Sequence, residues 1–111
     1  MKKLILISVA VFCTLFNTAA LCAGSGFSRG VIKTIHWYEG HSGVLIIQDG
    51  MSDLGGCGRT DYYILDDSHA YFKEIYALIL IAHASGQPLT IEVKDCVQGI
   101  SRIRHVSSTK S

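Results

Sequence analysis

Acidic, hydroxyl and imidazole side chains stand close together at residues 66–69, where they could do chemistry. Asp66, Ser68 and His69 are the ingredients of a hydrolase triad. A triad forms from side chains that converge in space, and residues this close in sequence do not provide its geometry. Acidic and hydroxyl residues before an apolar helical pattern are typical of a helix start. We therefore expect a helix cap here and predict that the protein is not an enzyme.

Two histidines are the residues that could hold a metal ion. His36 and His41 could share one ion, with Asp49 or Asp53 as a further ligand. Their spacing, from a strand to a turn, matches no established pattern of metal ligands. A strand histidine and a turn histidine explain both residues without a metal. The sequence therefore predicts no metal site and no cofactor.

Residues 1–23 have the three parts of a secretory signal peptide. Lys2 and Lys3 form a basic start, an apolar run follows over residues 4–16, and small and polar residues come next. The apolar run is shorter than the roughly 20 residues that span a bilayer, which disfavours a membrane anchor. We therefore expect export, with the mature chain secreted or periplasmic and without a membrane span.

The cleavage point stays open between two positions. Cleavage after Ala20 or after Ala23 fits the small residues of this region. A lipoprotein signal that acylates Cys22 is disfavoured, because Leu21 stands where such signals require a small side chain. The mature part is expected to be a single domain over residues 24–111 with a frayed C-terminal tail.

The charge balance changes when the leader is removed. The whole chain of 111 residues has 10 Lys and Arg against 9 Asp and Glu, and Lys2 and Lys3 belong to the leader. The mature domain therefore has a formal charge of −1. Such a balance lacks the basic signature of a nucleic-acid-binding protein, so we expect no nucleic-acid partner.

Two cysteines lie well inside the mature domain. Cys57 and Cys96 form an even pair in an oxidising compartment, where small domains use disulfides as cross-links. A reactive thiol pair is the alternative, but the two residues lack the short spacing of a redox motif. We therefore predict a structural Cys57–Cys96 disulfide, and chain entropy assigns such a loop about 4 kcal/mol of stabilisation.

The pattern of apolar residues predicts five strands and one helix. A helix over residues 71–84 shows apolar residues at steps of three and four, is ended by Gly86, and is expected to be largely buried. The last strand is expected to contain a bulge, because its apolar residues break the period of two. The predicted strands cover residues 31–38, 44–47, 62–65, 89–94 and 100–106, and residues 24–30 are expected to be irregular.

The order of these elements predicts the fold class. Three strands, one helix and two strands give a mainly β chain with one helix, in the α+β class. Five short strands around one apolar helix fit a small OB-like barrel with the order β-β-β-α-β-β.

Consecutive aromatic residues on the predicted strands are the candidates for binding. Side chains of neighbouring strand residues point to opposite faces, so one of Trp37 and Tyr38 and one of Tyr62 and Tyr63 should face outward. Exposed aromatic rings on such a barrel can stack on sugars or bases. We predict Trp37, Tyr38, His41 and Tyr63 as the binding residues.

Four stretches of the mature chain form a recognisable combination. They are Gly30-Val31-Ile32 through His36 and Gly40, the mid-chain Cys57, the helix with Phe72 and Tyr76 that ends in Ala84-Ser85-Gly86-Gln87-Pro88, and the strand from Leu89 to Val93. In this combination the chain resembles the binding (B) subunits of AB5 toxins of the subtilase-cytotoxin and typhoid-toxin type. It is similar as well to short exported bacterial proteins of unassigned role.

The resemblance implies a secreted OB-fold that recognises cell-surface glycans, assembles as a homo-oligomer of five subunits and joins an exported catalytic partner chain. The chain is shorter than those subunits and has a different cysteine pattern, so none of their sugar-contacting residues is carried over. The alternative is a periplasmic or envelope protein, structural or inhibitory, that binds another protein through a strand edge and has no glycan activity.

Overall fold

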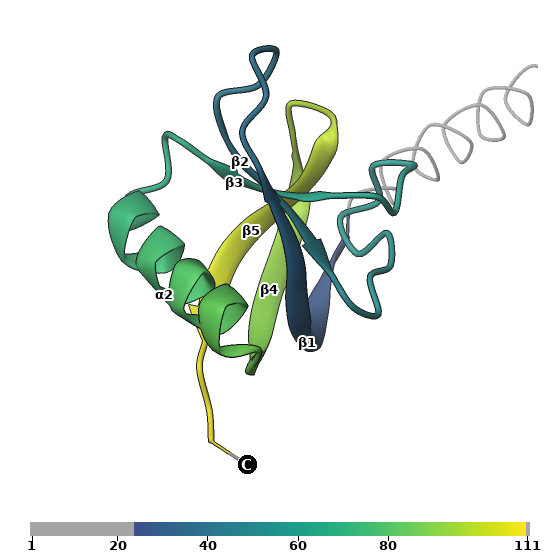
Figure 1. The fold of residues 1–111 in the computed structure, drawn as a ribbon. Helices are drawn as coiled ribbons and strands as arrows, with labels where there is room; N and C mark the ends of the chain where they lie inside the picture. Colours follow the sequence, from purple (N-terminus) through teal and green to yellow (C-terminus); the bar gives the residue numbers. More distant parts are fainter. Residues whose placement is uncertain (1–23, 111) are drawn as a thin grey trace, which may run out of the picture.

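A computed structural model describes residues 24–110, so the predicted signal peptide lies outside the described residues. The elements are β1 (Ser25–His36), β2 (Gly43–Gln48), β3 (Tyr63–Asp66), α2 (Phe72–Ser85), β4 (Pro88–Val97) and β5 (Ile100–Ser107) (Figure 1). This order confirms the prediction of three strands, one helix and two strands. Within residues 24–110, no helix is long and apolar enough to cross a bilayer.

The five strands join into one closed ring in the order β1-β2-β3-β5-β4. The long β1 closes it, because residues 25–31 pair with residues 88–94 of β4 and residues 32–36 pair with residues 45–48 of β2. Neighbouring strands are antiparallel except β3 and β5, which are parallel. The described chain is therefore mainly β with one helix, as predicted, and α2 lies along one side of the ring (Figure 1).

The first half of β1 corrects the expectation that residues 24–30 are irregular. The small residues of this segment predicted a loop, but the pairing of β1 with β4 requires a residue without a side chain at Gly30. A side chain at Gly30 would collide with the carbonyl oxygen of Asp49, and the Asp49 N–H donates to the Val31 carbonyl oxygen at 3.0 Å. Pairing with a distant strand thus overrides weak local strand propensity.

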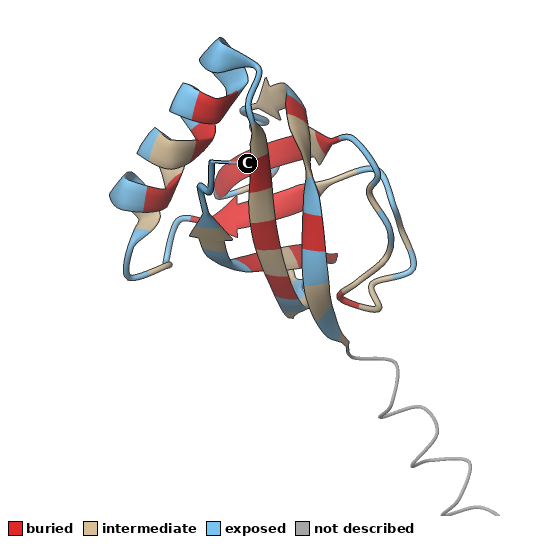
Figure 2. Cartoon of the chain, turned by 90° about the horizontal axis from the view of Figure 1, so that it is seen from below, coloured by how far each residue is buried: buried red, intermediate tan, exposed pale blue. Residues whose placement is uncertain are grey.

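Buried positions line the ring and the side of α2 that faces it (Figure 2). The core is apolar, and α2 contributes Ile75, Ile79 and Ala82 to it. A second, smaller cluster of Leu45, Ile64 and Ile100 is packed by Tyr62 and Val97. Along β2, Val44 and Ile46 belong to the main core while Leu45 belongs to the second cluster. Both faces of β2 are therefore covered by apolar side chains.

The helix ends where the sequence predicts. Gly86 adopts a left-handed conformation, with φ of 71°, and its N–H donates to the Ala82 carbonyl oxygen at 3.0 Å. The start of α2 differs from the prediction, because Tyr71 occupies the N-cap position and no side chain caps the helix. Asp66 instead accepts a hydrogen bond from the Ser68 N–H at 3.0 Å, so these residues shape the preceding turn.

The outer face of α2 corrects a second expectation. The helix was expected to be largely buried, but Leu80 is 42% exposed and Ile81 is 64% exposed. The helix packs on the ring with one side only, since the side away from the ring meets no other element of the described chain. Exposed positions run along this outer side (Figure 2), and they include apolar residues.

The last strand contains the predicted bulge. Glu92 pairs with His105 and the next residue, Val93, pairs with Ile103, so Arg104 is the extra residue in β5. The bulge lets Ile103 and Val106 pack on the same core although they are three residues apart.

The turn between β4 and β5 is hydrogen-bonded to two other segments through the side chain of Gln98. Gln98 and Gly99 both have positive φ, 54° and 76°, which is typical of a two-residue hairpin turn. The Gln98 amide nitrogen donates to the Ser42 carbonyl oxygen at 2.8 Å and to the Asp66 carboxylate at 2.7 Å. Its amide oxygen accepts the Ser42 N–H at 2.9 Å. Gln98 therefore ties the β1–β2 turn to the end of β3.

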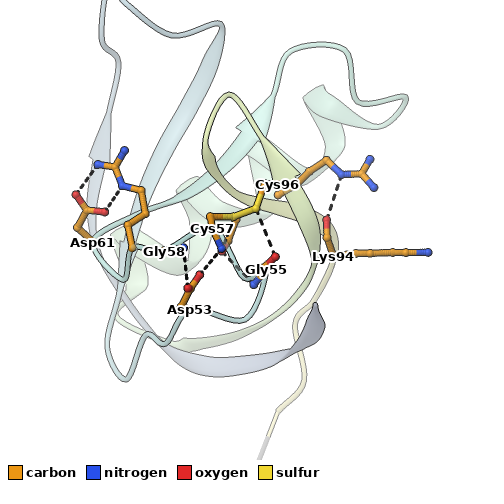
Figure 3. Close-up of a disulfide and its surroundings, with 10 residues drawn as sticks. Asp53, Gly55, Cys57, Gly58, Asp61, Lys94 and Cys96 are labelled. Carbon is orange, nitrogen blue, oxygen red and sulfur yellow. Dashed lines mark hydrogen bonds and ion pairs between the residues drawn. A yellow bond between two sulfur atoms is a disulfide. The ribbon is translucent and has the colours of Figure 1, made fainter. Parts of the chain in front are cut away.

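The Cys57–Cys96 disulfide is present, which confirms the predicted pairing (Figure 3). It joins the loop before β3 to β4, with 5.8 Å between the two Cα atoms. The Asp53 carboxylate accepts the Cys57 and Gly58 N–H groups, each at 2.8 Å. The Gly55 N–H donates to the Ser101 hydroxyl at 3.1 Å. Side-chain hydrogen bonds and the disulfide together hold this glycine-rich loop on the ring.

Replacing Cys57 and Cys96 with alanine is expected to lower the free energy of unfolding, because the disulfide joins residues 39 positions apart and so restricts the unfolded chain. Chain entropy predicts a loss of about 4 kcal/mol. Urea unfolding of the wild type and the double variant measures it. A reductant should lower the midpoint of the wild type alone, and equal midpoints for the two proteins would contradict the prediction.

Candidate functional site

Trp37 and Tyr38 are both at the surface. Trp37 is 58% exposed and Tyr38 is 44% exposed. The alternation of strand side chains predicted that only one would face outward, but β1 ends at His36 and the two residues lie beyond it. Both rings therefore project from the point where the chain leaves the sheet.

Tyr63 is not a surface residue, so the prediction that it is a binding residue is wrong. It is fully buried in the core, and its hydroxyl donates to the Ser52 carbonyl oxygen at 3.3 Å. The half-buried Tyr62 takes the outward position. One of the two tyrosines does face outward, as predicted. No local pattern separates the two tyrosines, because Ile64 and Leu65, which lie two residues after Tyr62 and Tyr63, are both fully buried.

His41 lies in the β1–β2 turn and is half-buried. Its N–H donates to the Tyr38 carbonyl oxygen at 3.1 Å, which closes the turn over residues 38–41. The Nδ1 atom of His41 is buried and has no hydrogen-bond partner within residues 24–110. The main role that the geometry gives His41 is to hold the turn from which Tyr38 projects.

One aromatic cluster, on the strand side of the site, consists of His36, Tyr38 and Tyr62. The His36 and Tyr38 rings stack with centroids 5.0 Å apart, and Tyr62 meets the His36 ring edge-on at 5.6 Å. The hydroxyls of Tyr38 and Tyr62 lie 3.1 Å apart. Only one of these hydroxyls can donate to the other, so one O–H is left to donate to a ligand.

An arginine borders this cluster, and its charge is already neutralised. The Arg59 guanidinium makes two hydrogen bonds of 2.6 Å to the Asp61 carboxylate and lies 5.7 Å from the centre of the Tyr62 ring. The hydrogen bond from Arg59 holds the pKa of Asp61 below its usual value. The hydrogen bond with Tyr38 raises the pKa of Tyr62, so the Tyr62 phenol keeps its proton at neutral pH.

A second aromatic cluster, on the helix side, consists of Trp37, Phe72 and Tyr76. The Trp37 indole N–H donates to the Tyr76 hydroxyl at 3.2 Å, and the two rings meet edge-on with centroids 5.5 Å apart. Phe72 lies 6.4 Å from Trp37. These contacts orient Trp37 against α2. Sequence reasoning assigned Phe72 and Tyr76 to the buried helix face and so missed their contact with Trp37.

We give the name aromatic surface to the outward rings of the two clusters, Trp37, Tyr38 and Tyr62, of which Trp37 leans on α2 and Tyr38 leans on Tyr62. It offers flat apolar rings whose positions are fixed by hydrogen bonds and edge contacts. Phenolic and imidazole groups lie at the ring edges. Such a surface can pack on an apolar face of a ligand and exchange hydrogen bonds with polar groups at its rim.

The group at residues 66–69 has a different geometry from a catalytic triad. The His69 Nδ1 atom accepts the Tyr71 N–H at 2.9 Å, which leaves Nε2 to donate to the Arg104 carbonyl oxygen at 2.8 Å. The Ser68 hydroxyl is hydrogen-bonded to the Asp66 carboxylate. Both ring nitrogens of His69 are therefore used by the backbone, and neither contacts Ser68.

Within residues 24–110, no three His, Cys, Asp or Glu side chains gather where they could hold a metal ion. Trp37 and Tyr38 are the two predicted binding residues that the structure brings together at the surface, with Tyr62 in place of Tyr63. No protein-family model, curated protein or solved structure matches the chain.

Proposed function

We propose that the protein is an exported, non-enzymatic OB-like module that recognises cell-surface glycans through the aromatic surface. The order of three strands, one helix and two strands around a closed ring supports an OB-like fold, which commonly binds oligosaccharides or oligonucleotides. The Cys57–Cys96 disulfide supports an oxidising compartment after export.

The exposure of Trp37 and Tyr38 as fixed aromatic rings carries this proposal. The C–H groups of a sugar ring form an apolar face with slight positive charge, which packs well on the negative face of an aromatic ring. Trp37 is held by Tyr76, and Tyr38 is held by Tyr62 and His36. Rings held in place before binding lose little conformational entropy when a ligand arrives.

The charges around the aromatic surface favour a sugar over a nucleic acid. A phosphate backbone needs cations that can release counterions. Arg59, which borders the surface, already binds Asp61 through two hydrogen bonds. Glu39 is exposed in the turn next to Tyr38 and would repel a phosphate. Glycan recognition therefore suits this surface better than base stacking.

Trp37→Ala and Tyr38→Ala are each expected to weaken glycan binding roughly tenfold, because each removes a stacking contact of about 1.5 kcal/mol. A glycan array identifies a ligand, and calorimetric titration gives its affinity for each variant. Tyr71→Ala is the matched control, since Tyr71 is 65% exposed but lies outside both clusters. Equal losses in all three variants, or no glycan signal for the wild type, would contradict the proposal.

A second candidate function, protein binding, is favoured by the outer face of α2. Leu80 and Ile81 are exposed on this face, next to the small side chains of Ala77 and Ala84. Apolar residues gathered on one surface are typical of protein interfaces. We propose that another subunit covers this face, either a further copy of the chain in a ring of five or an exported partner chain.

Self-assembly through this face predicts that light scattering of the wild type gives the mass of a pentamer. Leu80→Lys/Ile81→Lys is expected to shift the protein to the monomer, because assembly would bury two charges without partners. Lys94→Glu changes an exposed charge on β4, away from the outer face of α2, and should leave the mass unchanged. A monomeric wild type would contradict self-assembly and leave the partner chain as the occupant of this face.

A further inference from the structure

A small pocket lies where the turn between β3 and α2 meets β5, away from the residues of the aromatic surface. Its volume is about 210 Å³, and its lining is Asp66, Ser68, His69, Ala70 and Arg102. None of these residues belongs to either aromatic cluster. The pocket is therefore separate from the aromatic surface and has its own chemistry.

Asp66 gives the pocket a fixed negative charge. Its carboxylate is hydrogen-bonded to the Ser68 N–H, the Ser68 hydroxyl and the Gln98 amide. Burial raises the pKa of Asp66, but the hydrogen bonds from Ser68 and Gln98, together with the charge of Arg102, outweigh it and lower the pKa below its usual value. The Asp66 side chain is thus an oriented carboxylate at neutral pH.

Arg102 gives the same pocket a positive charge that no carboxylate neutralises by contact. Its Nε–H donates to the Lys94 carbonyl oxygen at 3.3 Å, which orients the guanidinium. No ion pair joins Arg102 to Asp66 or to another carboxylate among residues 24–110. The terminal nitrogens of Arg102 make no hydrogen bond with that part of the chain either. Its fork of N–H donors is therefore free to bind an anionic group.

The remaining lining adds acceptors but no further charge. The His69 ring is occupied on both nitrogens by backbone groups, as described above. The Ser68 hydroxyl gives its hydrogen to Asp66, so its oxygen can still accept a hydrogen bond. A ligand thus meets donors at Arg102 and acceptors at Asp66 and Ser68, on the walls of one small hollow.

We propose that this pocket binds a small zwitterion, an α-amino acid, with its carboxylate on Arg102 and its ammonium group on Asp66 and Ser68. A guanidinium binds a carboxylate through two parallel hydrogen bonds. A ligand with only one charge would satisfy one wall and be repelled by the other, since Asp66 opposes an anion and Arg102 opposes a cation. A zwitterion satisfies both walls, and the volume suits a ligand of this size.

The test uses calorimetric titration of the exported protein with a panel of the common α-amino acids. At least one is expected to bind in a saturable way. For that amino acid, the analogue without the ammonium group and the analogue without the carboxylate should each bind at least tenfold more weakly. This comparison on the wild-type protein does not depend on the folding of any variant.

Arg102→Gln should weaken binding at least tenfold. Arg104→Gln should leave it unchanged, because Arg104 lies on the same strand but does not line the pocket. Saturable binding to the wild type that both variants retain, binding of the singly charged analogues as strong as that of the amino acid, or no binding by any member of the panel would overturn the proposal.

Discussion

The double pairing of β1 is the constraint on which the rest of the structure depends. This strand pairs with β4 along its first half and with β2 along its second half, and the ring closes only because both contacts form on one continuous strand. The close approach of Asp49 at Gly30 allows this pairing only without a side chain. The inner core, the position of α2 against it and the direction of the β1–β2 turn all follow from this closure.

The aromatic surface is a consequence of where β1 stops. Trp37 and Tyr38 come immediately after the last paired residue, His36, so neither is held within the sheet. One ring then leans on α2 through Tyr76, and the other leans on Tyr62, the residue before β3. Elements that are far apart in the sequence thus orient two consecutive residues in different directions.

Gln98 links the β1–β2 turn to the end of β3 through its side chain. Its backbone has a positive φ that favours glycine, yet its side chain makes three hydrogen bonds that glycine would lose. Those bonds join the β1–β2 turn at Ser42 to Asp66, which lines the pocket beside β5. Gln98 therefore supports both the β1–β2 turn and one wall of the pocket.

Patterns of neighbouring residues predicted the features that depend on short stretches of the chain. Gly86 ends the helix, the spacing of Ile103 and Val106 indicates the bulge, and two cysteines without the spacing of a redox motif indicate the disulfide. The first half of β1 could not be predicted, because its strand character comes from a partner some 60 residues away.

The candidate site was predicted in part. Trp37 and Tyr38 were identified by residue type, but their joint exposure depends on where β1 ends. The choice of Tyr63 over Tyr62 was wrong because the face of a short strand is decided by its register with β2, and Ile64 and Leu65, both fully buried, give no local guide. The contact of Trp37 with Tyr76 depends on how α2 packs, which no pattern along the chain specifies.

Trp37 is the single tryptophan of the chain, so its fluorescence reports directly on the central claim that glycans bind at the aromatic surface. A glycan that binds the protein by calorimetry is titrated while the emission of Trp37 is recorded. The emission is expected to shift to shorter wavelength in a saturable way, because the sugar displaces water from the indole ring. The affinity obtained from this shift should equal the affinity from calorimetry. A glycan that binds by calorimetry but leaves the Trp37 emission unchanged would contradict the central claim.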